Sequence, residues 1–139
     1  MRLVLDTDVV VAAMRSPRGG AAELLRRIER GDATIALTVA LALEYEATCL
    51  RPEHQLASGL SQEEIQTYVT TLISLADPVK LHFRWRPQLS DPGDELVLEA
   101  AINGQAEAII TFNSRDFRGT ENFGITVMRP GEALRRLKP

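Results

Sequence analysis

The sequence predicts a three-layer α/β/α sandwich, in which helices cover both faces of a mainly parallel sheet. Short apolar runs such as Leu3–Leu5 lack the polar alternation of half-exposed strands, which is typical of strands buried on both faces. Segments with helical periodicity separate these runs, so strands and helices alternate along the chain. We expect the 139 residues to form one domain that spans residues 1–139.

The turn and capping signals divide the chain into elements. The expected strands cover residues 3–5, 33–37, 79–83, 108–111 and 125–128, and the expected helices cover residues 9–14, 21–30, 39–50, 61–75, 91–104 and 130–137. Thr38 is a plausible N-cap, and Ser61 with Glu64 forms a capping box. Pro52 is expected to end the helix before it and to leave a polar loop over residues 53–60. Residues 84–92 read as irregular, with Trp85 as a packing residue.

Composition excludes several classes of protein. Hydrophobic content of 45% and charged content of 25% are globular averages, and no apolar run approaches the ~20 residues that span a membrane. The N-terminus lacks a signal-peptide pattern, so we expect a cytoplasmic protein. The single cysteine, Cys49, excludes an internal disulfide and a zinc site built on cysteines. No Gly-x-Gly-x-x-Gly follows the first strand, which excludes a dinucleotide-binding domain.

The charge balance alone does not indicate a nucleic-acid binder. The formal net charge is -3, whereas such proteins usually carry a basic surface. All but two of the 16 Lys and Arg residues are Arg. Arginine binds phosphate well, but an excess of it also follows from genome composition alone.

Four acids are placed where the ends of parallel strands and the starts of helices meet. Asp6 ends the first strand, Glu44 lies inside an apolar helix, Asp94 lies in the first turn of a later helix, and Asp116 follows the strand that ends at Thr111. In a parallel sheet these positions share one edge, so the four side chains are expected to converge.

Each acid also has a structural interpretation when it is taken alone. Asp6 or Thr7 would cap the next helix, Glu44 would snorkel or pair with an arginine, and Asp116 would be a turn residue. Asp91 with Asp94 resembles an N-cap followed by an acid that the helix dipole favours. For Asp91 the capping role is the favoured one.

Several carboxylates at one edge repel each other unless a cation neutralises them. No cysteine cluster is available. His54, in the polar loop, and His82, in a strand, lack the spacing of metal ligands and are expected to be structural. A site made of oxygen ligands suits Mg²⁺ or Mn²⁺, and such an ion favours hydrolysis of a phosphodiester.

The sequence resembles the PIN-domain nucleases over nearly its whole length, and in particular the toxin-like members of bacterial toxin–antitoxin systems. The resemblance rests on the motifs at residues 3–8, 38–52, 89–95 and 110–117. It implies that Asp6, Glu44 and Asp94 hold the divalent ion. It also implies a ribonuclease that cleaves RNA, forms a homodimer and is inhibited by a small antitoxin protein.

The expected catalytic residues are Asp6, Glu44, Asp94 and Asp116, and the expected accessory residues are Asp8, Asn113 and Thr111. The resemblance gives Asp116 or Asn113 as the fourth, more variable position, and leaves open whether a second metal ion binds. Thr111 ends the strand that precedes both residues. Asp8 is a departure, because the family usually has Asn at this position.

Two other functions compete with the nuclease. Asp6-Thr-Asp8-Val-Val also resembles the signature of haloacid-dehalogenase-like phosphatases, in which the two aspartates are nucleophile and acid/base. Thr38 and Lys80 would then belong to later motifs, but the polar stretch before Asp91 does not fit the last of them. The other alternative is a PIN-like module that binds RNA or a protein without cutting, which the retention of all three core acids argues against.

Overall fold

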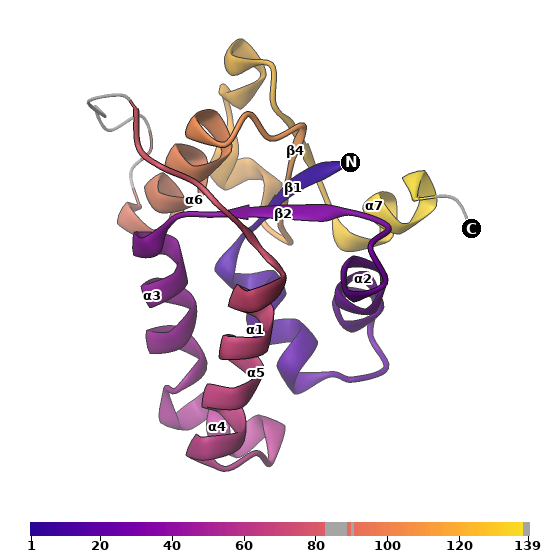
Figure 1. The fold of residues 1–139 in the computed structure, drawn as a ribbon, viewed down its shortest axis with the longest axis vertical. Helices are drawn as coiled ribbons and strands as arrows, with labels where there is room; N and C mark the ends of the chain where they lie inside the picture. Colours follow the sequence, from indigo (N-terminus) through magenta and orange to yellow (C-terminus); the bar gives the residue numbers. More distant parts are fainter. Residues whose placement is uncertain (83–88, 90, 138–139) are drawn as a thin grey trace.

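The computed structural model describes residues 1–82, 89 and 91–137, and within them five strands form a parallel sheet in the order β3-β2-β1-β4-β5 (Figure 1). The strands are β1 (Arg2–Leu5), β2 (Thr34–Leu37), β3 (Asp77–Pro78), β4 (Ala108–Ile110) and β5 (Thr126–Met128). Strand β1 lies at the centre, where Leu3, Val4 and Leu5 are fully buried. This matches the expectation drawn from the apolar run.

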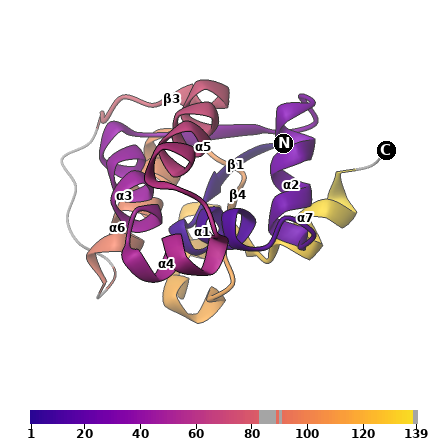
Figure 2. The same cartoon turned by 90° about the horizontal axis from the view of Figure 1, so that it is seen from below.

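Helices cover both faces of the sheet, which confirms the predicted three-layer fold class. The helices are α1 (Thr7–Arg15), α2 (Gly20–Glu29), α3 (Val39–Cys49), α4 (Pro52–Ser58), α5 (Gln62–Leu75), α6 (Pro92–Asn103) and α7 (Pro130–Arg136). Two 3-10 turns, η1 (Ser114–Phe117) and η2 (Thr120–Phe123), follow β4. Helices α2 and α7 pack together on one side of the sheet, and α3, α5 and α6 lie on the other (Figure 2).

The strand order creates a crevice at the end of β1. The chain leaves β1 toward β2 on one side, and β4 pairs with β1 on the other. Ligands of parallel α/β sheets bind beyond the carboxyl ends of the strands at such a change of direction. The residues that follow β1 and β4 therefore lie next to each other at the place where a site is expected.

The expected polar loop over residues 53–60 is wrong, because these residues form most of helix α4. Helix α3 does end just before Arg51-Pro52, but Pro52 then takes the first position of α4. Proline suits this position, since its fixed φ is helical and its missing N–H would have no partner there. Gly59 ends α4 at φ 73°, a conformation that glycine adopts without strain.

The expected strand over residues 79–83 is also wrong, because the pairing with β2 occurs earlier, at Asp77–Pro78. The amide of Val79 still donates to the Leu37 carbonyl oxygen at 2.9 Å. The His82 amide donates instead to the Asn103 side chain at 2.8 Å, so the chain has left the sheet. The irregular stretch 84–92, with Trp85, and the end of the expected strand at Phe83 lie largely outside the described residues.

The other elements match the sequence predictions to within one or two residues at most ends. Thr38 caps α3 through its side chain, and Ser61 and Glu64 form the complete capping box of α5. Cys49 is buried in the core, as expected for a small apolar residue. None of the helices in the described part of the chain has the length and apolar character needed to cross a membrane.

Candidate functional site

Asp6 is held at the sheet edge by backbone and side-chain contacts to β4 and the residue after it. Its amide donates to the Ile110 carbonyl oxygen at 2.9 Å, which extends the pairing of β1 with β4 by one residue. The Thr111 hydroxyl donates to Asp6 Oδ2 at 2.7 Å. Asp6 is the N-cap residue of α1, yet its side chain makes no capping hydrogen bond. The carboxylate is therefore oriented by Thr111, not used as a cap.

Asp8, in the first turn of α1, is anchored to the segment that follows β4. Its Oδ2 accepts hydrogen bonds from the Phe112 amide at 3.1 Å and from the Asn113 side-chain amide at 3.0 Å. Its Oδ1 is buried and has no hydrogen-bond partner among the described residues. A buried carboxylate oxygen without a partner is costly unless a donor or a cation reaches it.

Glu44 reaches the same edge from helix α3, whose position is fixed by the next residue. The buried Tyr45 hydroxyl donates to the Leu5 carbonyl oxygen, at the last residue of β1. Glu44 is half-buried, and its Oε1 accepts a hydrogen bond from the Thr48 hydroxyl at 3.2 Å. Ion pairing with an arginine, the structural alternative for Glu44, is not among the salt bridges of the described residues.

The start of α6 supplies two further carboxylates. Asp91 is the N-cap and accepts from the amides of Gly93 at 2.8 Å and Asp94 at 3.2 Å, which confirms the capping role expected for it. The same helix start faces α3, because a Cβ built on Gly93 would lie 3.8 Å from Glu44 Oε1. The tight contact of such a Cβ would be with Asp91 Oδ1, at 3.0 Å, whereas its distance from Glu44 is an ordinary van der Waals contact.

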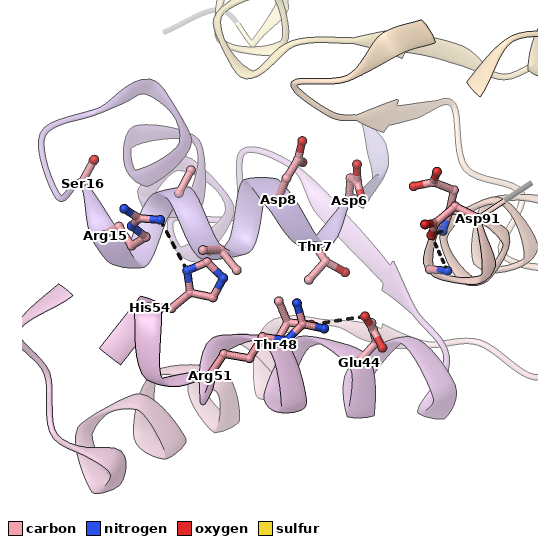
Figure 3. Close-up of a pocket in the computed structure, with 14 residues that line it drawn as sticks. Asp6, Thr7, Asp8, Arg15, Ser16, Glu44, Thr48, Arg51, His54 and Asp91 are labelled. Atoms are coloured by element: carbon pink, nitrogen blue, oxygen red, sulfur yellow. Dashed lines mark hydrogen bonds between the residues drawn. The ribbon is translucent and has the colours of Figure 1, made fainter. Parts of the chain in front are cut away.

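These side chains line one open cavity of about 690 Å³ (Figure 3). The residues around it come from the end of β1, from α1, α3 and α4, and from the start of α6. They are Asp6, Thr7, Asp8, Val11, Ala12, Arg15, Ser16, Glu44, Thr48, Arg51, His54, Asp91, Gly93 and Asp94.

The electrostatics of the cavity follow from burial and crowding. Burial, with the charge of Asp8 next, raises the pKa of Asp6 to about 7, although the Thr111 hydrogen bond opposes the rise. Burial followed by the charges of Asp91 and Asp116 raises the pKa of Asp94 to about 6. Burial also raises the pKa of Asp8. The pocket thus favours proton uptake or the approach of a cation.

The structure brings most of the expected site residues together. Asp6, Asp8, Glu44 and Asp94 line the cavity, and Thr111 and Asn113 contact the aspartates from behind it. Asp116 lies exposed on η1, outside the lining residues, although its charge contributes to the raised pKa of Asp94.

The basic residues that line this cavity were not predicted from the sequence. Arg15, Arg51 and His54 line it together with Thr48. The sequence predicts a loop and a purely structural role for His54, but this residue lies on α4 and faces the cavity. The sequence signal for these residues is the helix start at Pro52, because it places Arg51 and His54 beside the end of α1.

The residues present fit a hard divalent cation. The donors at the acidic side are carboxylate oxygens, which Mg²⁺ and Mn²⁺ prefer, and one buried carboxylate oxygen has no partner among the described residues. Within the same part of the chain, no group of three or more His, Cys, Asp or Glu side chains stands in a metal-holding arrangement. Ion binding would therefore require some of these side chains to move closer together.

Comparison with known proteins identifies the family. The sequence profile of the PIN domain matches residues 2–115, which is most of the chain. The chain belongs to the PIN-domain family. Members of this family are generally nucleases that use divalent metals, which supports a hydrolase.

The fold of this PIN domain is shared with a solved structure of VapBC2. A chain in the crystal structure of VapBC2 from Rickettsia felis bound to a DNA fragment from their promoter matches it with a TM-score of 0.63. The match covers 91% of this chain and 98% of that chain, at 15% sequence identity. At this identity the likeness shows the fold alone. No curated protein matches the chain at a significant level of sequence similarity.

The phosphatase alternative does not agree with the geometry of this PIN domain. Thr38, which would serve a later phosphatase motif, is buried and caps α3 by accepting the Leu41 amide at 3.1 Å. Lys80 lines a different cavity, together with Arg2 and His82. Neither side chain lies among the residues around Asp6 and Asp8.

The raised pKa of Asp6 predicts how stability depends on pH without metal. The pKa is about 7 in the folded protein, against 3.8 for an aspartate free of the fold, so the folded state binds the proton more tightly. The resulting destabilisation is full above about pH 7 and disappears as the pH falls toward 3.8. In EDTA, we expect the melting temperature to fall as the pH is raised from about 5.5 to about 8.5, and Asp6→Asn to flatten this dependence.

Thermal unfolding monitored by circular dichroism checks this prediction. Glu121→Gln is the matched control, because it removes an exposed carboxylate on η2 outside the cavity. The control should keep the wild-type dependence on pH. If Asp6→Asn also keeps the wild-type dependence, the buried charge of Asp6 is not its cause.

Proposed function

We propose that this PIN-domain protein is a metal-dependent endoribonuclease and the toxin of a toxin–antitoxin pair. The observation that carries the proposal is the joint placement of Asp6, Glu44 and Asp94 in one cavity from three separate elements. Folding brings these like charges together at a cost in free energy. Such a cluster is expected where a bound cation neutralises the carboxylates. The family match supports a nuclease.

The proposed metal ligands are Asp6, Glu44 and Asp94, with Mg²⁺ or Mn²⁺ as the ion. Bound there, the ion would lower the pKa of a water molecule and stabilise negative charge on the phosphodiester. Asn113 and Asp116, the two candidates for the fourth position of the family pattern, would have different roles. Asn113 holds Asp8, whereas Asp116 adds negative charge near Asp94.

The surrounding residues would orient the three acids. The Thr111 hydroxyl fixes one oxygen of Asp6 and leaves the other for the ion. The Thr48 hydroxyl donates to Glu44, and Tyr45 ties α3 to the end of β1 so that Glu44 stays opposite Asp6. Asp91 caps α6 and thereby fixes the position of Asp94. Such supporting contacts would orient the three acids so that they close on a metal ion when it binds.

The choice of RNA and of an antitoxin rests on two kinds of support. The sequence motifs resemble the toxin-like branch of the family, and the structural neighbour from Rickettsia felis is VapBC2 bound to promoter DNA. We therefore propose single-stranded RNA as the substrate, a small antitoxin protein as the inhibitor, and a homodimer in the cytoplasm as the working form.

The first test of this function is cleavage of labelled single-stranded RNA by purified protein. We expect cleavage with Mg²⁺ or Mn²⁺ and none in EDTA. Asp6→Asn, Glu44→Gln and Asp94→Asn should each reduce the rate by about a hundredfold or more, because each keeps the side-chain volume and removes a ligand charge. Asp116→Asn should be milder, since Asp116 lies outside the cavity lining.

The control for this test is Glu121→Gln, which should cleave like the wild type. Full activity in EDTA would contradict metal dependence. Wild-type activity for Glu44→Gln would leave Glu44 with a structural role only. Metal-independent RNA binding without any cleavage would instead favour the non-catalytic PIN-like module.

A second prediction concerns Asp8, the residue at which the chain departs from the family pattern. Asn at this position keeps an oxygen that can accept from Phe112 and Asn113, and it removes the charge that raises the pKa of Asp6. RNA cleavage by Asp8→Asn should therefore stay within about tenfold of the wild type, with an altered ratio of Mg²⁺ to Mn²⁺ activity. A loss as complete as that of Asp6→Asn would make Asp8 a member of the core set.

A further inference from the structure

The cavity that holds the acids is also lined by basic residues. Asp6, Asp8, Glu44 and Asp94 line the cavity together with Arg15, Arg51 and His54. Figure 3 shows Arg15 and His54 toward the α4 end of the cavity, away from Asp6 and Asp91, and the Arg51 side chain extending along α3 toward Glu44. The proposed metal chemistry uses only the acidic side. The basic side, defined here as Arg15, Arg51 and His54, has no role in it.

The basic side is built by two helices that meet at their ends. Arg15 is in the last turn of α1, where a cation is favoured by the helix dipole. Arg51 is the N-cap residue of α4, and His54 lies in its first turn. Helices α1 and α4 contact each other, so the three side chains share one wall although Arg15 and His54 are 39 positions apart.

In the described part of the chain, neither arginine of the basic side forms a salt bridge with an acid. Salt bridges in the described residues engage Arg2, Arg26, Arg27, Arg30 and Arg136, but neither Arg15 nor Arg51. Asp8 and Glu44 line the same cavity, yet neither forms an ion pair with these arginines in the described residues. Two exposed guanidinium groups thus remain available to an anion.

Arg15 orients the His54 ring so that it can also donate to an anion. The Arg15 guanidinium lies 3.4 Å from His54 Nδ1, and a guanidinium can only donate. When the ring is neutral, this contact makes Nδ1 the acceptor and leaves the ring hydrogen on Nε2. That N–H is a further donor for an anionic oxygen. Figure 3 shows the imidazole between Arg15 and the cavity side of α3.

We propose that the basic side binds the phosphate groups of single-stranded RNA next to the phosphodiester that is cut. This inference rests on the proposed function. An RNA strand laid across the acids places its neighbouring phosphates along the cavity, and Arg binds phosphate oxygens with two parallel hydrogen bonds. The groove between α1 and α3 then sets the direction of the strand, from the start of α6 toward α4.

The charge of the whole molecule makes such a local site necessary. With a net charge of -3, the protein does not attract RNA at long range, and the acids repel it. Proteins that bind single strands without reading sequence depend on a positively charged groove that follows the backbone. The basic side is the part of the cavity that provides this charge.

The test compares Arg15→Gln and Arg51→Gln with the charge-matched control Arg135→Gln. Arg135 is exposed on α7, lies outside the cavity and forms no salt bridge in the described residues. With Mg²⁺ and labelled single-stranded RNA, Arg15→Gln and Arg51→Gln should each raise KM about fivefold while kcat stays within about twofold. The control should leave both constants unchanged.

Fluorescence anisotropy in EDTA measures RNA binding separately from cleavage. The slope of log affinity against log salt should become shallower by about 0.7 for each arginine removed, which is the value for one lost phosphate contact on a single strand. The double variant should lose about twice that amount. Melting temperatures of all variants should match the wild type, because both arginines are exposed.

The outcomes separate this inference from the proposed function. Cleavage by the wild type, with Arg15→Gln and Arg51→Gln indistinguishable from Arg135→Gln in KM and salt slope, overturns the inference and leaves the nuclease intact. RNA binding that depends on both arginines without metal-dependent cleavage overturns the nuclease and supports the basic side. A fall in kcat without a change in KM would also contradict the inference, because it would place the arginines in the chemistry.

Discussion

The candidate site depends on the parallel pairing of β1 with β4. This pairing continues through the Asp6 amide to the Ile110 carbonyl oxygen, and so places Thr111 directly beside the carboxylate of Asp6. The order of strands opens the sheet edge at this point, where neighbouring connections diverge. Strand β1 fixes the position of Asp6, and helices α3 and α6 bring Glu44 and Asp94 to the same cavity.

The burial of neighbouring carboxylates costs free energy, and this cost explains why the cavity favours a cation. Folding buries Asp6 beside Asp8, and the protein does not relieve the repulsion with an arginine or lysine in the described residues. An inward-facing arginine would stabilise the fold but would occupy the place of the proposed metal ion. The cations that line the cavity come instead from the end of α1 and the start of α4. This arrangement leaves the acids for the proposed ion and the basic residues for phosphates.

Much of the candidate site could be predicted from the sequence because the parallel topology alone decides which residues share one edge of the sheet. Strand-end and helix-start positions in a parallel fold share an edge, so Asp6, Glu44 and Asp94 converge without knowledge of any particular contact. The basic side could not be predicted in this way. It requires the end of α1 to meet α4, a helix that the sequence predicts as a loop when Pro52 is considered only as a helix terminator. The third strand is misplaced because the weak alternation over residues 79–83 is a poor guide at a sheet edge.

The most direct test of the central claim is the binding of Mn²⁺, measured by titration calorimetry on wild type, Asp6→Asn and Glu121→Gln at neutral pH without RNA. We expect saturable binding to the wild type and to the Glu121→Gln variant, and loss of that binding when the Asp6 charge is removed. Equal Mn²⁺ binding by Asp6→Asn and wild type would contradict it, because the residue at the centre of the site would then play no part in holding the ion.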